Sequence, residues 1–170
     1  MVQSPLRGVA AHSLDASRRQ TVGFVGLGQM GGPMADNVLR GGYPLAVFDL
    51  DTRKVERAVA QGAQAASSAA DVAQRASCVI TMVDTTEQAE EVILGRHGTA
   101  ESAQEGDAIL CMGTIDPMVL KRMHGVLAAR GIDLVDAPVS GMEKGAREGT
   151  LKAFVGASPE ALEKVRDVLE

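Results

Sequence analysis

The chain has 170 residues, a formal net charge of −5, 45% hydrophobic residues and only 2% aromatic residues. This length suffices for one domain with a buried core, whereas the acidic balance and the scarcity of aromatic rings disfavour contacts with nucleic-acid phosphates and bases. No apolar run approaches the roughly 20 residues that a transmembrane helix needs, so we expect neither a nucleic-acid partner nor a membrane span.

The first twenty residues differ in composition from the rest. They contain three arginines, several serines and alanines, and one acidic residue, Asp15, without helical or strand periodicity. We predict a flexible N-terminal extension over residues 1–20 and one domain over residues 21–170. The extension lacks the continuous apolar segment of a secretory signal. An arginine-bearing, acid-poor leader also fits a mitochondrial transit peptide, but a cytoplasmic location is favoured over the mitochondrial matrix.

From Thr21 onward, short apolar runs alternate with helical patterns. Six runs are typical of strands: Val22–Leu27, Leu45–Phe48, Cys78–Val83, Ala108–Met112, Ile132–Val135 and Leu151–Val155. Asp116-Pro117 and Ser158-Pro159 are typical helix starts, with an oxygen-bearing cap followed by proline. Strands that alternate with helices of this length build parallel βαβ units. We therefore predict an α/β fold with a doubly wound, mainly parallel sheet flanked by helices.

The turn after the first predicted strand carries the pattern G-x-G-x-x-G. It consists of Gly26, Leu27, Gly28, Gln29, Met30 and Gly31. Glycines in this pattern let the backbone and a helix N-terminus approach a pyrophosphate closely. The required context is present, because an apolar strand precedes the pattern and an amphipathic helix follows it. The sequence therefore predicts a Rossmann-type dinucleotide-binding domain.

An acidic residue at the end of the next predicted strand completes this fingerprint. Asp49 follows Gly28 by 21 residues, where its carboxylate can accept hydrogen bonds from the adenosine ribose. The same carboxylate would repel the 2′-phosphate of NADP, and Leu50 stands where an NADP enzyme more often has arginine. We therefore predict NAD in preference to NADP, with Arg53 as the residue that would favour NADP.

The cysteines and histidines indicate no further chemistry. Cys78 and Cys111 lie within apolar runs, as buried and inert thiols do, and two cysteines make no disulfide framework. The three histidines lie far apart in the sequence, without the spacing of metal ligands. We predict no metal site.

Three segments together resemble the β-hydroxyacid dehydrogenase family, which includes 3-hydroxyisobutyrate dehydrogenase and tartronate semialdehyde reductase and is related to 6-phosphogluconate dehydrogenase. Residues 26–37 (GLGQMGGPMADN) resemble the family's opening, and residues 113–117 (GTIDP) its turn beside the nicotinamide. Residues 136–151, which begin DAPVSG, resemble its substrate-binding segment. The resemblance spans residues 21–170 in the family's order. It implies an NAD(P)-dependent oxidoreductase that transfers a hydride between NAD and a small β-hydroxyacid or its semialdehyde.

The resemblance also implies roles for individual residues. The implied cofactor residues are Gly26, Leu27, Gly28, Gln29, Met30, Gly31, Asp49, Leu50, Val83, Asp84 and Thr114. Val83-Asp84 replaces the Leu-Pro that the family usually has beside the cofactor, so this contact is altered. Thr114 would also lie near the substrate, whose carboxylate Ser140 and Gly141 would hold. Met142 stands where the family usually has a second glycine, and its side chain would narrow the substrate site.

The family's general acid–base is a lysine in the pattern G-x-x-K-x-x-x-N, on a helix that leads into an all-helical C-terminal domain. Residues 141–144 and 149–152 fit G-x-x-K, but Glu148 and Gly156 stand where the asparagine should be. Asn37 is the only asparagine of the chain, so the full motif is absent and no catalytic residue is assigned. We expect the family's lysine beyond Glu170, and interpret the chain as a cofactor-binding half that lacks the C-terminal helical domain and is almost inactive alone.

Two other functions stay open from the sequence. The chain could be a catalytically inactive NAD-binding module, or an imine-reductase-like member of the superfamily, in which the lysine is replaced. The match at Ser140-Gly141 favours a small carboxylate substrate over an imine. We also predict a homo-oligomer, because apolar residues of the last helix, Leu162, Val165 and Leu169, would form an exposed patch, and such patches self-associate.

Overall fold

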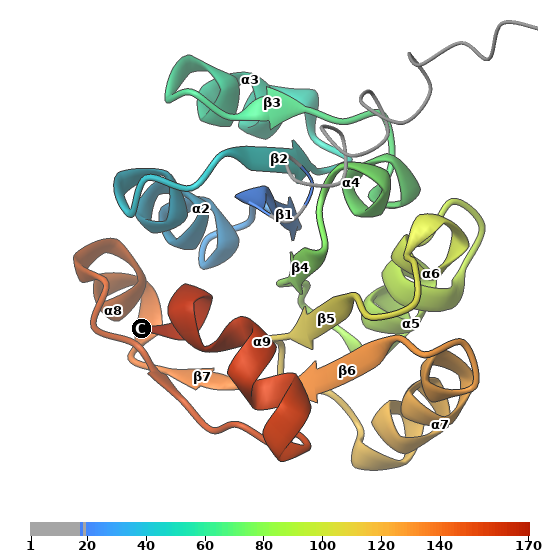
Figure 1. Ribbon diagram of the computed structural model, residues 1–170. Helices are drawn as coiled ribbons and strands as arrows, with labels where there is room; N and C mark the ends of the chain where they lie inside the picture. Colours follow the sequence, from blue (N-terminus) through green and yellow to red (C-terminus); the bar gives the residue numbers. More distant parts are fainter. Residues whose placement is uncertain (1–17, 19) are drawn as a thin grey trace, which may run out of the picture.

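The computed structural model of the chain describes residue 18 and residues 20–170 (Figure 1). Most of the predicted extension over residues 1–20 therefore lies outside the described residues. The main sheet has six parallel strands in the order β3-β2-β1-β4-β5-β6. These strands are β1 (Val22–Val25), β2 (Leu45–Phe48), β3 (Gln64–Ala65), β4 (Cys78–Thr81), β5 (Ala108–Cys111) and β6 (Asp133–Asp136). The predicted mainly parallel α/β fold is confirmed.

Helices cover both faces of this sheet. They are α2 (Gly31–Arg40), α3 (Thr52–Ala60), α4 (Ala69–Arg75), α5 (Thr86–Leu94), α6 (Thr99–Ser102), α7 (Pro117–Ala128), α8 (Met142–Glu148) and α9 (Pro159–Leu169). Residues of α2, α3, α8 and α9 pack on one face, and residues of α4 to α7 pack on the other (Figure 1). This two-sided arrangement is the predicted doubly wound architecture. Among the described residues, no helix combines the length and the apolar character that crossing a membrane requires.

Successive residues of each inner strand point to opposite faces, so the sheet has a hydrophobic core on each side. Phe24 and Ile80 pack under α2, whereas their neighbours Val25 and Val79 pack under the helices of the other face. All four side chains are at most 3% exposed. Burial on both faces is the reason that these strands are continuous apolar runs in the sequence.

The observed strands differ from the predicted runs in several places. The run Val22–Leu27 stops being a strand at Val25, because Gly26 turns the chain with a φ of +93°. The run Leu151–Val155 contributes only β8 (Lys152–Ala153), which pairs antiparallel with β7 (Val139–Ser140) in a separate two-stranded sheet. Both residues of β3 are exposed at the sheet edge, so no apolar pattern marks that strand.

The predicted helix starts are confirmed. The Asp116 side chain accepts a hydrogen bond from the Met118 amide at 2.7 Å, and Pro117 opens α7. The Ser158 hydroxyl accepts one from the Ala161 amide at 3.1 Å, and α9 opens at the following proline. Each cap satisfies an amide that the first helical turn leaves without a partner.

The predicted apolar patch on the last helix is wrong for Val165. This side chain is fully buried against the sheet, while Leu162 and Leu169 are only partly exposed. The reason is that α9 packs its apolar stripe onto β5 and β6. Exposed apolar side chains occur elsewhere, such as Met118 at 71% and Phe154 at 65% exposure. Self-association stays a prediction.

Arg18 lies within the predicted extension, yet it is held by the domain. Its Nη1 donates to Asp107 Oδ1 at 2.8 Å, and its Nη2 forms a second contact with the same carboxylate. Further hydrogen bonds run from Arg18 to the carbonyls of Ala73 and Gln74 at the end of α4. The two charged side chains are 10% and 6% exposed. This buried pair ties the chain before β1 to the start of β5.

We predict that Arg18→Met strongly destabilises the fold, because it leaves the Asp107 carboxylate buried without its cation. The expected loss is about 3–5 kcal/mol in the free energy of unfolding, measured by urea denaturation. Arg166→Met is the matched control, since Arg166 makes a similar pair with Glu163 but at the exposed surface of α9, and it should leave stability almost unchanged. Equal stabilities for the two variants would contradict the role of the buried pair.

Candidate functional site

The parallel strands bring most predicted site residues to one edge of the main sheet. Because all six strands run the same way, their carboxyl ends lie side by side. The glycine turn follows β1, Asp49 follows β2, and Val83-Asp84 follows β4. Thr114 follows β5 in the turn before α7, and its side chain is exposed. Residues from four separate strand ends thus share this carboxyl edge.

The three glycines of the turn differ in what a side chain at each position would meet. A Cβ on Gly26 would lie 2.2 Å from the Met82 carbonyl oxygen, and one on Gly31 would lie 1.9 Å from the Gly26 oxygen. These two positions therefore need glycine for the chain to pack. A Cβ on Gly28 would meet nothing within 4 Å. The space over Gly28 is open, as it must be for a pyrophosphate to approach the backbone.

The backbone amides of the turn divide into two groups. The Leu27 amide donates to the Asp49 carboxylate at 2.7 Å, and the Leu27 side chain is buried in the core. Within the described part of the chain, the amides of Gly28, Gln29 and Met30 donate to no other protein group. These amides lead into the first turn of α2, whose N-terminus adds a positive dipole. The turn can therefore receive an anion.

The Asp49 carboxylate lies between two loops. Oδ2 accepts the Leu27 amide, and Oδ1 accepts the Asp51 amide at 2.8 Å. The ammonium group of Lys54 lies 3.6 Å from Oδ1, and the Asp49 side chain is 11% exposed. A carboxylate has about four acceptor positions, so two backbone bonds leave room for hydroxyl donors. This geometry suits the predicted contact with a ribose.

A cleft of about 370 Å³ extends from the glycine turn along this edge. Predicted cofactor residues line it: Gly26, Gly28, Asp49, Leu50, Val83 and Asp84. Leu50 is 92% exposed, so its apolar side chain stands free at the cleft. The Asp84 amide donates to the side chain of Gln88 at 2.9 Å, which fixes the turn before α5. Glycine turn, acidic residue and the altered Val83-Asp84 turn thus meet in one cavity.

The cleft also contains residues that sequence reasoning missed. They are Asp51, Lys54, Gln88, Glu91 and Val92, which precede or lie within α3 and α5. For Asp51, Lys54 and Gln88 the available signal was their position before or within the first helical turn after a strand, whereas Glu91 and Val92 lie further along α5 and carry no such signal. Acidic side chains outnumber the single cation, Lys54, along the walls. Arg53 hydrogen-bonds Asp51 and thereby lowers the pKa of that carboxyl below its ordinary value.

The predicted substrate residues form the junction between β7 and α8. Ser140 ends β7 and is exposed, and Gly141 precedes α8 with a φ of +139°. Met142 has a φ of +55°, which is uncommon for a residue with a side chain, and it is 83% exposed. This junction is joined to the glycine turn, because the Gln29 side-chain amide donates to Glu143 at 2.7 Å.

Other polar groups of the described residues add no competing chemistry. No cluster of three or more metal-ligating side chains occurs among them. Burial raises the pKa of the Cys78 thiol to about 12, and also raises the pKa of the fully buried Cys111. Such thiols stay protonated and unreactive near neutral pH. Lys144 and Lys152, from the two incomplete lysine motifs, are both exposed.

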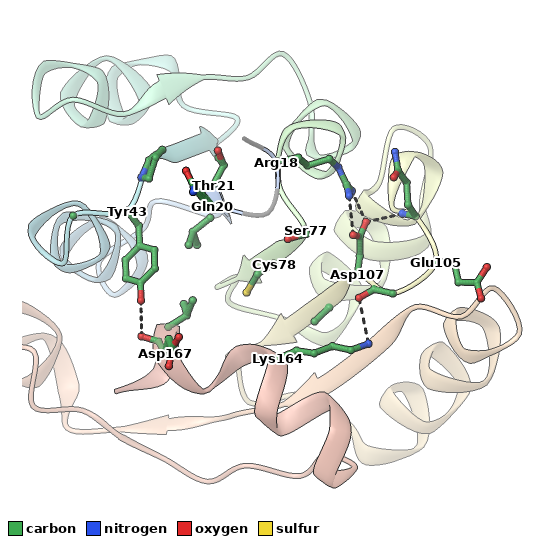
Figure 2. Close-up of a pocket in the computed structure, with 17 residues that line it drawn as sticks. Arg18, Gln20, Thr21, Tyr43, Ser77, Cys78, Glu105, Asp107, Lys164 and Asp167 are labelled. Atoms are coloured by element: carbon green, nitrogen blue, oxygen red, sulfur yellow. Dashed lines mark hydrogen bonds and ion pairs between the residues drawn. The ribbon is translucent and has the colours of Figure 1, made fainter. Parts of the chain in front are cut away.

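A second cavity, of about 680 Å³, lies at the opposite edge of the sheet, where the strands begin (Figure 2). Three of its charged side chains, Arg18, Asp107 and Lys164, are already engaged with protein groups. Arg18 pairs with Asp107, and Lys164 donates to Asp133 at 2.7 Å. The Tyr43 hydroxyl donates to the Asp167 carbonyl at 3.0 Å. This cavity lacks the glycine turn and Asp49, the predicted cofactor residues that line the carboxyl-edge cleft.

Comparison with known proteins agrees with this geometry. Residues 21–170 match the family model described as the NAD binding domain of 6-phosphogluconate dehydrogenase. An NAD-dependent L-serine dehydrogenase of Pseudomonas aeruginosa is 43% identical over 88% of this chain and 50% of its own length. A 3-hydroxyisobutyrate dehydrogenase of the same organism is 40% identical with the same coverage.

Solved structures give the same result. The crystal structure of 3-hydroxyisobutyrate dehydrogenase from Salmonella typhimurium superposes with a TM-score of 0.82 at 30% identity, covering 88% of this chain and 52% of that one. The chain thus spans about half the length of the relatives it matches. Fold, glycine turn and family model agree. The chain belongs to the family of NAD-binding domains typified by 6-phosphogluconate dehydrogenase, with relatives among the 3-hydroxyisobutyrate dehydrogenases.

Proposed function

We propose that this chain binds NAD in the carboxyl-edge cleft, as the cofactor-binding part of an oxidoreductase that acts on a small β-hydroxyacid or its semialdehyde. One observation carries the proposal: the open space over Gly28 lies in the same cleft as the Asp49 carboxylate. The amides of Gly28 to Met30 would hold the pyrophosphate, and Asp49 would hold the adenosine ribose. Bound NAD would supply the site that accepts or donates the hydride.

The charges of the cleft support NAD over NADP. Asp49, Asp51, Asp84 and Glu91 line it, and a 2′-phosphate would be placed among these carboxylates. Lys54 offers one positive charge, but it already lies beside Asp49. Arg53 is not a wall residue of this cleft and pairs with Asp51 at 3.0 Å. Repulsion between like charges would therefore weaken NADPH binding.

The substrate assignment rests on the junction between β7 and α8. Ser140 and Gly141 are exposed residues, and the Ser140 hydroxyl and the backbone amides around Gly141 are donors suited to a carboxylate. The exposed side chain of Met142 would restrict the size of the acid that fits. Thr114 would contribute a hydroxyl from the neighbouring strand end. The names of the relatives, which act on serine and 3-hydroxyisobutyrate, support a small hydroxyacid.

Proton transfer would need a group that these 170 residues do not provide in the family's form. The complete G-x-x-K-x-x-x-N motif is absent from the sequence. Lys144 is 83% exposed and pairs with Glu148 at 3.9 Å, so it is no substitute. We propose that the chain binds the cofactor and positions the substrate, whereas the general acid–base lies elsewhere in the whole protein.

We predict that the chain binds NADH more tightly than NADPH in titrations that follow the fluorescence of the cofactor. The chain has no tryptophan, so energy transfer from that residue cannot interfere. Asp49→Asn should weaken NADH binding about tenfold and narrow the preference over NADPH, because it removes a charged acceptor and a repulsive charge.

Glu160→Gln is the control for this titration, since it removes an exposed carboxylate at the start of α9, outside the cleft. It should bind both cofactors as the parent chain does. Equal or tighter binding of NADPH by the parent chain would contradict the preference for NAD. Binding of neither cofactor to a folded chain would contradict the proposed site.

The three glycines separate folding from binding. Gly28→Ala should fold normally, because its Cβ enters open space, but should weaken NADH binding at least about tenfold by filling the pyrophosphate position. Gly31→Ala should lower the free energy of unfolding by about 2 kcal/mol or more, because its Cβ collides with the Gly26 carbonyl. Urea denaturation and the NADH titration measure the two effects. A Gly28→Ala variant that binds NADH normally would show that the space over Gly28 is not used.

A further inference from the structure

The cofactor turn and the substrate junction are linked through two neighbouring helices. Besides the bond from Gln29 to Glu143, the Asn37 side-chain amide donates to the Ala146 carbonyl at 2.5 Å. Arg40, at the end of α2, donates to the Arg147 carbonyl at 3.1 Å. These contacts pair the segment 29–40 with the segment 143–147 in the same order. The two helices therefore run side by side in the same direction, with the glycine turn and the substrate junction at their matching ends.

Glu143 is the contact nearest to the predicted substrate residues. It lies in the first turn of α8, directly after Met142, and its carboxylate receives hydrogen bonds from two sides. Gln29 Nε2 donates to Oε2, and Arg147 Nε donates to Oε1 at 2.8 Å. These donors lower the pKa of Glu143, so its carboxylate stays charged near neutral pH. The bond from Gln29 thus ends on a fixed, ionised acceptor.

The residue before Glu143, Met142, has a strained backbone conformation that neighbouring contacts must stabilise. Met142 adopts the left-handed conformation, with a φ of +55°, in a position next to Gly141. A residue with a side chain holds this conformation only where neighbouring contacts stabilise it. The hydrogen bonds that hold Glu143 also restrict the peptide between Met142 and Glu143, and therefore help to fix the conformation of the 140–142 turn.

We propose that Glu143 couples cofactor binding to the substrate turn, as a positioning residue that acts through Gln29. A pyrophosphate held by the amides of Gly28 to Met30 would immobilise the backbone of Gln29. The Gln29 side chain would then hold Glu143, and Glu143 would hold the turn at residues 140–142. This inference rests on the proposed binding of a dinucleotide at the glycine turn. It assigns to Glu143 a function that depends on the cofactor.

The test is amide hydrogen exchange over residues 139–149, measured by mass spectrometry with and without NADH. Each variant is first titrated, and NADH is then used at saturation. In the parent chain, NADH should slow exchange in this segment at least about threefold. Glu143→Ala removes the acceptor and should abolish this slowing. Glu143→Gln keeps an acceptor oxygen for Gln29 and should retain it.

The control is Glu163→Ala, which removes an exposed acceptor paired with Arg166 on α9, and it should retain the slowing. A purely structural role of Glu143 would speed exchange equally with and without NADH, so only the difference between the two states reports coupling. Equal slowing in Glu143→Ala and the parent chain would overturn the inference. Saturable NADH binding with no slowing in the parent chain would also overturn it. Failure of the parent chain to bind NADH would instead refute the proposed function and, with it, the coupling.

Discussion

The site depends on the carboxylate of Asp49, which holds together two loops that are far apart in sequence. One oxygen accepts the Leu27 amide of the glycine turn, and the other accepts the Asp51 amide before α3. A charged acceptor with two backbone donors is a strong arrangement when the side chain is 11% exposed. The same group therefore shapes the glycine turn, where we propose that the pyrophosphate binds, and leaves acceptor positions for the proposed ribose contact. Asp49 therefore both stabilises the two loops and is the residue proposed to bind the ribose.

The parallel sheet explains why such a residue can serve both purposes. Parallel strands place every strand-to-helix turn at one edge, so residues from four turns meet there. The opposite edge carries the buried pair of Arg18 and Asp107, which fixes the beginning of the domain. The buried pair thus lies at the edge of the sheet opposite the proposed cofactor cleft. Substitutions at Arg18 and at Gly28 should accordingly affect different properties.

Much of this arrangement could be predicted from the sequence, because its signals are local. The glycine pattern, the acidic residue after the second strand, and the caps Asp116 and Ser158 each lie within a short window. The hydrogen bond from Gln29 to Glu143 joins residues 114 positions apart. Nothing about a glutamine or a glutamate in the sequence indicates that these two side chains meet. The exposed strand β3 has no apolar pattern that would predict it, and no local signal predicts that β8, in the run Leu151–Val155, pairs with β7 across helix α8. The burial of Val165 cannot be predicted locally, because only tertiary packing shows which face of α9 meets the sheet.

The most direct test of the account is to locate NAD on the chain by amide chemical shifts in a ¹⁵N-labelled sample. Binding at the carboxyl edge predicts that the largest shift changes upon addition of NAD occur at residues 26–31 and 49–51. Gly42 and Gly106, which line the cavity at the opposite edge, should change little. Largest changes at Gly42 and Gly106, with residues 26–31 unaffected, would contradict the assignment of the glycine turn and Asp49 as the cofactor site.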